Sequence, residues 1–245
     1  MSGYTLTYRR DAKSIDGAVV RPDVLGALSL DEMQQRVGIA FEITGQPGDT
    51  LTLRHAPPLH RLGALMSRGT LIVEGDAGDD LGASMTGGLI HVRGSAGHRV
   101  GGPDFTSPRG MTGGEIVIEQ NAGDYAGFRM RRGLLVVQGG AGASPGYRMS
   151  AGTLVVGRGP LDHPGLEMRR GTIVCLDNKQ PTRLNEAFVE DSRFSAAETV
   201  ALRLLFARLR QLGVPIDNAT DNATFLLASG DRFELNKGEL WLRAS

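Results

Sequence analysis

The sequence has one cysteine in 245 residues and no apolar run of the roughly 20 residues that a membrane-spanning helix requires. A single thiol, Cys175, can build neither a disulfide framework nor a thiolate metal site. The opening residues, MSGYTLTYRRDAKS, contain no apolar signal core. We therefore expect a soluble cytoplasmic protein in which Cys175 is a buried structural side chain.

An excess of charge of either sign is also missing. Lysine plus arginine and aspartate plus glutamate both number 27, so net charge favours neither a nucleic acid nor a membrane surface as partner. Lysine itself is scarce, since 24 of the 27 basic residues are arginine. The planar fork of arginine suits carboxylates and phosphates, but a coding bias produces the same skew, so the skew alone indicates no ligand.

The sequence lacks the motifs of familiar catalytic sites as well. Its five histidines are scattered, and no H-x-x-E-H, C-x-x-C or G-x-S-x-G pattern occurs. No spacing suggests a pair of buried carboxylates. Nothing nominates a nucleophile, a general base or a set of metal ligands. We therefore expect that this chain alone has no catalytic residues, binds no metal and holds no cofactor of its own.

Glycine is abundant, with 35 residues, and most of the excess lies in one pattern written six times between residues 62 and 176. Each copy has a methionine, a glycine three residues later, a short β-forming run and a full or partial G-x-x-G-x-x-x-G motif. The methionines are Met66, Met85, Met111, Met130, Met149 and Met168. The steps between them are 19 residues, except for one of 26 that contains a seven-residue insertion. A fixed period of about 20 residues is typical of a solenoid.

The short runs predict a mainly β solenoid. About four residues cannot form a stable strand alone, so equivalent runs must stack at about 4.8 Å, giving a parallel β-helix of about six 19-residue coils. Leu71, Val73 and their counterparts then point inward, and the residue between them points outward. We interpret the methionines as core side chains beside glycine corners. The alternative, a thioether ladder for Cu(I), has no other metal ligand nearby.

Segments without the period flank the repeats, so we expect three units, at 1–60, 61–177 and 178–245. The first contains probable strands at 4–8, 37–44 and 50–54 and a helix that begins after Ser29. In the last, Ser195 to Glu198 forms a capping box for a helix that continues to Gly213. Strands at 224–228 and 233–242 follow, and this unit would cap the open edge of the last coil.

Arginines gather beside the methionines of the later coils. They are Arg129, Arg131, Arg132, Arg148, Arg169 and Arg170. Such a cluster could bind a polyanion or an acidic partner through bidentate hydrogen bonds; the alternative is a solvated face balanced by nearby acids. The insertion at 102–109 must project from the coils, and there Pro103, Phe105 and Arg109 would suit contact with a partner protein.

These repeats resemble the domain shared by the C-terminal part of the glutamate synthase large subunit and by the C subunit of formylmethanofuran dehydrogenase. In that group the repeat folds as a right-handed parallel β-helix. Two features outside the repeats favour the second family. Pro22-Asp23-Val24 with Leu28-Ser-Leu-Asp-Glu32 looks like its opening segment, and Gly230-Asp231 with Lys237-Gly-Glu-Leu240 is similar to its terminal strand motif. The resemblance covers nearly the whole chain.

Within that family, one branch belongs to the bacterial formyltransferase/hydrolase complex of methylotrophs. There the C subunit is a non-catalytic partner of amidohydrolase-like, B and formyltransferase subunits. That complex moves a formyl group from tetrahydromethanopterin to a methanofuran-type carrier and releases formate. The resemblance therefore implies a structural or docking subunit in one-carbon metabolism, from formaldehyde to formate, whose arginine face holds the acidic glutamyl tail of the carrier.

Three alternatives stay open. The chain could be the C subunit of an archaeal molybdenum or tungsten formylmethanofuran dehydrogenase, or a glutamate-synthase-like module that supports amidotransfer. It could also be a surface-interaction solenoid with no enzyme partner. The arginine bias and the helix expected at 195–213 favour the bacterial complex. The seven-residue insertion, and Arg158 and Leu161 where the last repeat should have glycine, leave the partner contacts unassigned.

Overall fold

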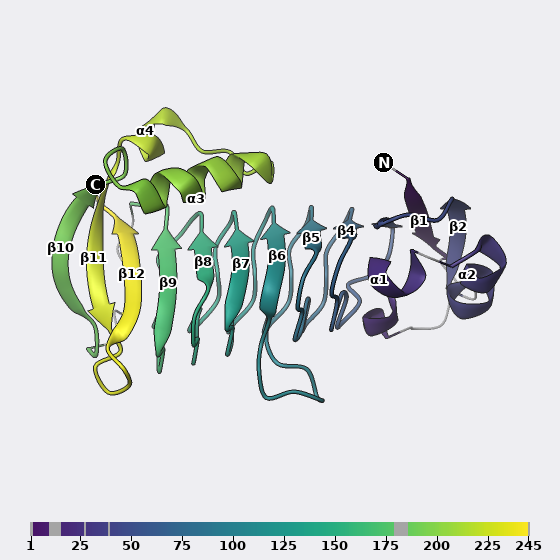
Figure 1. Ribbon diagram of the computed structural model, residues 1–245, viewed down its shortest axis with the longest axis horizontal. Coiled ribbons are helices and arrows are strands. Elements are labelled where there is room, and N and C mark those ends of the chain that lie inside the picture. The colour runs from purple at the N-terminus through teal and green to yellow at the C-terminus, as the bar shows by residue number, and fades with distance from the viewer. Residues whose placement is uncertain (1, 10–15, 27, 39, 179–185, 245) are drawn as a thin grey trace.

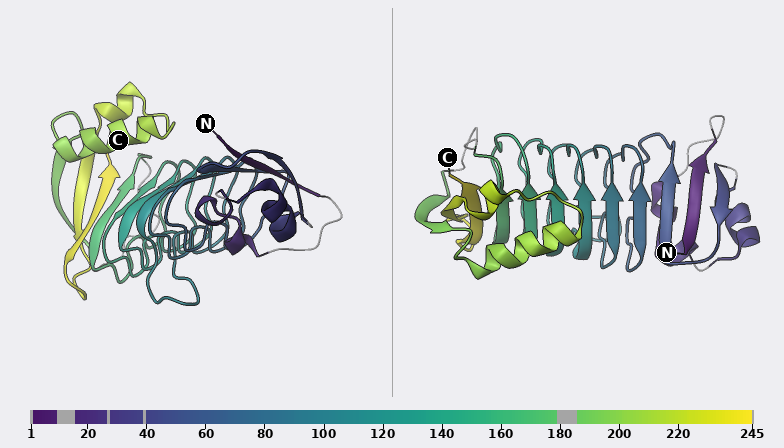
Figure 2. Two further views of the ribbon diagram at one scale, coloured as in Figure 1. Left: turned by 45° about the vertical axis from the view of Figure 1, so that its right-hand side comes forward. Right: turned by 90° about the horizontal axis from the view of Figure 1, so that it is seen from above.

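Six short parallel strands, one from each copy of the repeat, form the middle of the structure. The computed structural model describes residues 2–9, 16–26, 28–38, 40–178 and 186–244. The six strands are β4 (Thr70–Val73), β5 (Leu89–Val92), β6 (Thr112–Ile118), β7 (Arg132–Val137), β8 (Thr153–Val156) and β9 (Arg170–Cys175). They lie side by side along the long axis of the molecule (Figure 1), and the turns of chain that connect them are stacked in the same way (Figure 2).

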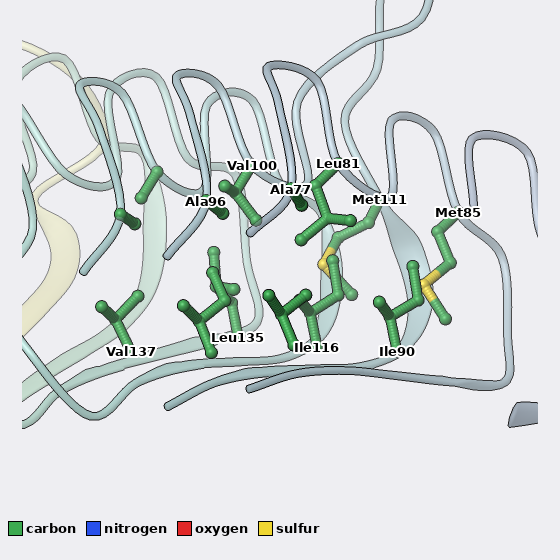
Figure 3. Close-up of a cluster of buried hydrophobic side chains, with 14 of the residues drawn as sticks. Ala77, Leu81, Met85, Ile90, Ala96, Val100, Met111, Ile116, Leu135 and Val137 are labelled. Atoms are coloured by element: carbon green, nitrogen blue, oxygen red, sulfur yellow. The ribbon is translucent and has the colours of Figure 1, made fainter. Parts of the chain in front are cut away.

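The strands pair in the register that the repeat predicts. Leu71 lies opposite Ile90, which lies opposite Ile116, and the row continues in this way through β9. The side chains of this row and of the row that begins with Val73 are buried. In Figure 3, Ile90, Ile116, Leu135 and Val137 of these rows lie in line beneath the connecting turns. Each row is therefore a continuous apolar column that repeats at the spacing of the strands.

The methionine of each copy packs against the glycine of the next copy. All six methionines are fully buried, which confirms that they belong to the core. At Gly88, φ is +85° and an added Cβ would lie 2.6 Å from Cε of Met66; at Gly114 it would lie 2.7 Å from Cε of Met85. Glycine adopts positive φ without steric cost and leaves room for the sulfur-bearing side chain. The two residues of the repeat therefore form one steric unit.

Both ends of the chain extend the same sheet. The added strands are β1 (Gly3–Tyr8), β2 (Phe41–Gly45), β3 (Thr50–Arg54), β10 (Val189–Ser195), β11 (Thr224–Gly230) and β12 (Lys237–Arg243). β3 and β12 pair parallel with β4 and β9, whereas β2 and the β10–β11 pair add antiparallel strands. The result is a mixed, open sheet of 12 strands. The mainly β fold is confirmed, and the closed right-handed β-helix stays a prediction.

The helices of the N-terminal part are short. They are the 3-10 helix η1 (Gly17–Val19), α1 (Pro22–Leu25) and α2 (Leu30–Val37). Ser29 caps α2 as predicted: its Oγ accepts a hydrogen bond from the backbone N–H of Glu32 at 3.4 Å, and the Glu32 carboxylate accepts one from the N–H of Ser29 at 2.8 Å. The strand expected over 37–44 is wrong at its start, because α2 keeps the chain helical to Val37 and β2 begins at Phe41.

The C-terminal helices are α3 (Val200–Gln211) and α4 (Asn218–Asp221). The predicted capping box at Ser195 is wrong, since Ser195 ends β10, where it pairs with Thr224. Pairing in the sheet outweighs the local capping signal, and the hydroxyl of Thr199 donates to the carbonyl of Ser195 at 2.8 Å. The strand expected over 233–242 is also wrong at its start, because 231–236 form a loop before β12.

α3 runs across β6 to β9 at the upper ends of these strands in Figure 1. Its buried residues Leu202, Phe206 and Leu209 pack in one cluster with the middle residues of those strands, among them Val136 and Val155. Those middle residues were expected to face solvent, and the expectation is wrong wherever the helix lies over them. No helix within the described ranges has the length and apolar character to cross a bilayer.

Candidate anion-binding site

The six arginines predicted from the repeat line one cavity of about 750 Å³. Its lining consists of Arg129, Arg131, Arg132, Arg148, Arg169 and Arg170, joined by Pro108, Arg109, Ser150, Ala151, Glu167, Glu234 and Leu235. The insertion contributes Pro108 and Arg109, and the loop at 231–236 contributes Glu234 and Leu235. The cavity is therefore made by three segments that are far apart in the sequence.

The period of the coils explains the arrangement of the arginines. Arg131 and Arg132 follow Met130, and the corresponding arginines two coils later follow Met168. In the coil between them the same positions hold Ser150 and Ala151. Since neighbouring coils are separated by about 4.8 Å, two arginine pairs flank a floor of small side chains at a separation of about 10 Å. A ligand with two or more anionic groups fits this pattern.

The cavity carries a strong positive charge. Seven arginines against two glutamates leave a formal charge of +5 on its lining. Arg148 Nε donates to Glu167 at 2.7 Å, and Arg169 Nε donates to Glu234 at 2.9 Å. Within the described part of the chain, the remaining arginines of the lining have no carboxylate at ion-pair distance: they are Arg109, Arg129, Arg131, Arg132 and Arg170. Their guanidinium groups are available to an anion.

Two of the arginines rest on an aromatic layer. The rings of Phe128 and Tyr147 stack with centroids 5.4 Å apart, and the guanidinium groups of Arg129 and Arg148 lie over these rings at 5.4 and 5.0 Å. The hydrogen bond from Arg148 lowers the pKa of Glu167, and the same bond raises the pKa of Arg148. Arg129 and Arg148 are therefore held in place by the fold, whereas Arg131, Arg132 and Arg170 project without such support.

The insertion loop, residues 102–109, is tied to the coils at its base. The Asp104 side chain is 1% exposed, and its Oδ1 accepts from Arg61 Nη2 at 2.8 Å. Burial raises the pKa of Asp104, but the hydrogen bonds from Arg61 and Thr106 outweigh it and the pKa is lowered. Next to it, Phe105 is exposed and Pro103 is half-buried. Of the predicted contact residues, Arg109 lines the cavity, whereas Pro103 and Phe105 do not.

The hairpin loop, residues 231–236, was missed because its sequence was assigned to a strand. The turn after β11 continues to Asn236, which has φ +50°. The exposed aromatic side chain of Phe233 lies in this loop. The sequence did contain a signal for this turn, because asparagine, here Asn236, readily adopts the left-handed conformation found in turns.

Other polar side chains hold neighbouring coils together. His98 Nδ1 accepts a hydrogen bond from the N–H of Asp124 at 3.0 Å, and the N–H of His98 donates to Asp79 at 2.8 Å. Among the residues that the structure describes, no group of three or more His, Cys, Asp or Glu side chains could hold a metal ion. Cys175 is buried, and its burial raises the pKa of the thiol to about 11.

A second cavity, of about 580 Å³, lies between the segment that joins α3 to α4 and the outer face of β7 and β8. Val136 and Val155 contribute apolar side chains to it, and Arg158 and Asp217 contribute charges. None of the residues predicted to form a site lines this cavity. The arginine cavity is therefore the candidate site.

Comparison with solved structures identifies a relative that matches over the full length of both chains. No protein-family model matches the sequence, and no curated protein matches it. A chain in the crystal structure of the formyltransferase/hydrolase complex (FhcABCD) from Methylorubrum extorquens, in complex with methylofuran, has a similar structure, with a TM-score of 0.81. The two sequences are 33% identical, and the match covers 98% of this chain and 100% of the relative.

Proposed function

Because the chain belongs to the family of the formyltransferase/hydrolase complex component that it matches, we propose that it is a non-catalytic structural and docking subunit of a complex of that type. The observation that carries the proposal is the match over the full length of both chains at 33% identity. The relative was crystallised within the formyltransferase/hydrolase complex. This origin favours that complex over a molybdenum or tungsten dehydrogenase and over an amidotransfer module.

The finer assignment is to the C subunit. Its partners are then amidohydrolase-like, B and formyltransferase subunits in the cytoplasm, and its coils close into a right-handed parallel β-helix. The arrangement of the repeat supports this assignment, since β4 to β9 pair parallel and in register, one strand from each copy. A rigid stack of this kind offers a long surface on which catalytic subunits can be positioned.

The arginine cavity is proposed to hold the acidic tail of a methanofuran-type carrier. The relative's complex contains methylofuran. In this chain, Arg131, Arg132 and Arg170 project into a cavity of formal charge +5 without a carboxylate partner in the described residues. Bidentate contacts from guanidinium groups suit successive carboxylates of an extended tail.

Purification of the tagged full-length chain from its own cells, grown on methanol, tests the subunit role. We expect formyltransferase and amidohydrolase-like subunits to copurify in fixed ratios and to be identified by mass spectrometry. A chain that elutes alone refutes the subunit role. Copurification of glutamine amidotransferase and flavin-binding chains would support the amidotransfer module instead.

The tail-binding role has a separate test in the purified complex. We expect Arg131→Gln, Arg132→Gln and Arg170→Gln together to reduce the amount of retained carrier about tenfold or more, with subunit ratios unchanged. The matched control replaces Arg68, Arg93 and Arg203, which are exposed and lie outside the cavity. The control removes the same charge and should leave retention unchanged. Equal retention in the two triple variants would contradict carrier binding in this cavity.

A further inference from the structure

Two phenylalanines are almost fully exposed. Both lie on loops at the same edge of the sheet, where β6 and β12 begin. Phe105 in the insertion loop is 87% exposed, and Phe233 in the hairpin loop is 85% exposed. The insertion loop precedes β6 and the hairpin loop precedes β12, and both project beyond the lower ends of these strands (Figure 1). α3 lies at the opposite, upper ends. Aromatic residues are enriched at protein–protein interfaces relative to the rest of the protein surface.

Each of these phenylalanines follows or neighbours a buried aspartate that ties its loop to the coils. In the insertion loop, Asp104 accepts hydrogen bonds from Arg61 at 2.8 Å and from the hydroxyl of Thr106 at 3.0 Å. In the hairpin loop, Asp231 is 2% exposed and accepts from the N–H of Phe233 at 2.9 Å. The same Asp231 carboxylate accepts from the N–H of Glu167 at 3.1 Å.

The two loops are therefore ordered before any partner arrives. Arg61 also lies over the ring of Phe105, with its Cζ 4.9 Å from the centroid. Glu234 joins the hairpin loop to the coils through its ion pair with Arg169. A contact surface that is already rigid loses little conformational freedom on binding. An exposed aromatic ring on a rigid loop is thus suited to act as an anchor.

The same two loops form opposite walls of the arginine cavity. Pro108 and Arg109 come from the insertion loop, and Glu234 and Leu235 come from the hairpin loop. A partner that contacts both loops therefore extends from one wall of the cavity to the other. Exposed cations lie within four residues of the two phenylalanines in the sequence. They are Arg109, Arg232 and Lys237, and none has a carboxylate at ion-pair distance within the described ranges.

We infer that the insertion loop and the hairpin loop form a paired docking surface for another subunit of the complex. That subunit presents two apolar recesses rimmed by carboxylates, which receive Phe105 and Phe233 and face the neighbouring cations. Because it contacts both loops, this subunit covers the opening of the arginine cavity. The anion site therefore becomes enclosed only in the assembled complex. This inference rests on the proposed function and adds the location and chemistry of one contact between subunits.

The test compares exposed side chains on opposite sides of the molecule. Phe105→Ser and Phe233→Ser are made singly and together in the full-length tagged chain, and Leu204→Ser on α3 is the matched control. Leu204 is 68% exposed, so all three substitutions remove an exposed apolar side chain. The readouts are the ratio of identified formyltransferase/hydrolase subunits to the tagged chain, the dissociation constant of the partner subunit, and the melting temperature of the free chain.

We expect each phenylalanine variant to weaken binding of one subunit about tenfold or more, which is the scale of an aromatic anchor. The melting temperature of each phenylalanine variant should equal that of wild type. The Leu204→Ser variant should bind the partner subunit as tightly as wild type does. A photo-crosslinking phenylalanine analogue at position 105 or 233 should trap the same subunit, and one at position 204 should not. Normal subunit ratios in the double variant, or crosslinks from both loops only to a second copy of this chain, overturn the inference while the proposed function stands. A wild-type chain that binds no subunit refutes both.

Discussion

Replacing Phe206 by alanine tests whether α3 is held on the sheet by the apolar face that the structure describes. Phe206 is 1% exposed and belongs to the cluster that joins α3 to the middle residues of β6 to β9. Its ring also lies 6.3 Å from that of Phe225 in β11. Phe206 therefore connects the helix both to the strands of the repeats and to β11 of the C-terminal region.

The expected cost follows from the burial of the ring. Truncation of a buried phenylalanine to alanine removes its transfer free energy and leaves a cavity, with a typical total of about 3–5 kcal/mol. The matched control, Leu204→Ala, lies on the same helix and has a side chain that is 68% exposed. Both variants place alanine, a strong helix former, in the same helix. The difference between their losses of unfolding free energy therefore measures the effect of burial. The control should change stability by no more than about 0.5 kcal/mol.

The chain offers a convenient probe for this measurement. Trp241 is the one tryptophan in the sequence and lies in β12, with its ring 5.5 Å from that of Phe194. Unfolding in urea can be followed by Trp241 fluorescence and compared with the far-ultraviolet circular dichroism signal. We expect the Phe206→Ala midpoint to fall by the amount that corresponds to at least about 3 kcal/mol at the measured slope.

A loss of less than about 1 kcal/mol for Phe206→Ala would contradict the packing of α3 on the sheet. Equal losses in the two variants would contradict it as well, because burial is the property in which the two positions differ. A fluorescence transition that precedes the circular dichroism transition in both proteins would show that the C-terminal region unfolds before the repeats.

Three further outcomes follow from the repeats and the insertion loop. Gly133→Ala should cost several kcal/mol, since φ is +100° and the new Cβ would lie 2.5 Å from the carbonyl oxygen of Gly114; Gly159→Ala, with φ +81° and open space, should cost only about 1–2 kcal/mol in urea unfolding. Because burial raises the pKa of the Cys175 thiol to about 11, iodoacetamide at pH 8 should label it only in urea. Because the pKa of Asp104 is lowered in the folded protein, its carboxylate contributes stability above the ordinary pKa of 3.8, and this contribution is lost as the pH falls through the lowered pKa. On acidification, the urea midpoint of Asp104→Asn should therefore fall less than that of wild type.

The repeat could be predicted in register because its physical cause is local to each copy. Met66 packs beneath Gly88, and the same pair recurs in every later coil, so one steric requirement is written repeatedly. The alternation of Leu71 and Val73 with a middle residue identifies the inward face in the same way. Positions repeated in this manner carry their own evidence, since each copy confirms the interpretation of the others.

The environment of the outward-facing residues of the repeat strands could not be predicted in this way. It depends on α3, which belongs to a segment that lacks the repeat. Val136 and Val155 look like solvent-facing residues of a two-sided strand, and only the helix that returns over them from the C-terminal region explains their side chains. Ser195 shows the same limit in reverse. Its capping signal is sound locally, but pairing with Thr224 places it at the end of a strand. Tertiary contacts decide both cases.

The arginine cavity combines these two situations, which explains how much of it the sequence could indicate. The arginines were predicted because they occupy repeated positions, and the repeat also provides the gap between them, where Ser150 and Ala151 stand in the intervening coil. The walls come from the two segments that break the period, the insertion loop and the hairpin loop. Coils that were all identical could present a charged stripe but could not close it into a cavity. The segments that depart from the repeat are therefore the ones that enclose the arginines in a cavity, and substitution of the exposed Phe105 and Phe233 in these loops should weaken partner binding at little cost to folding.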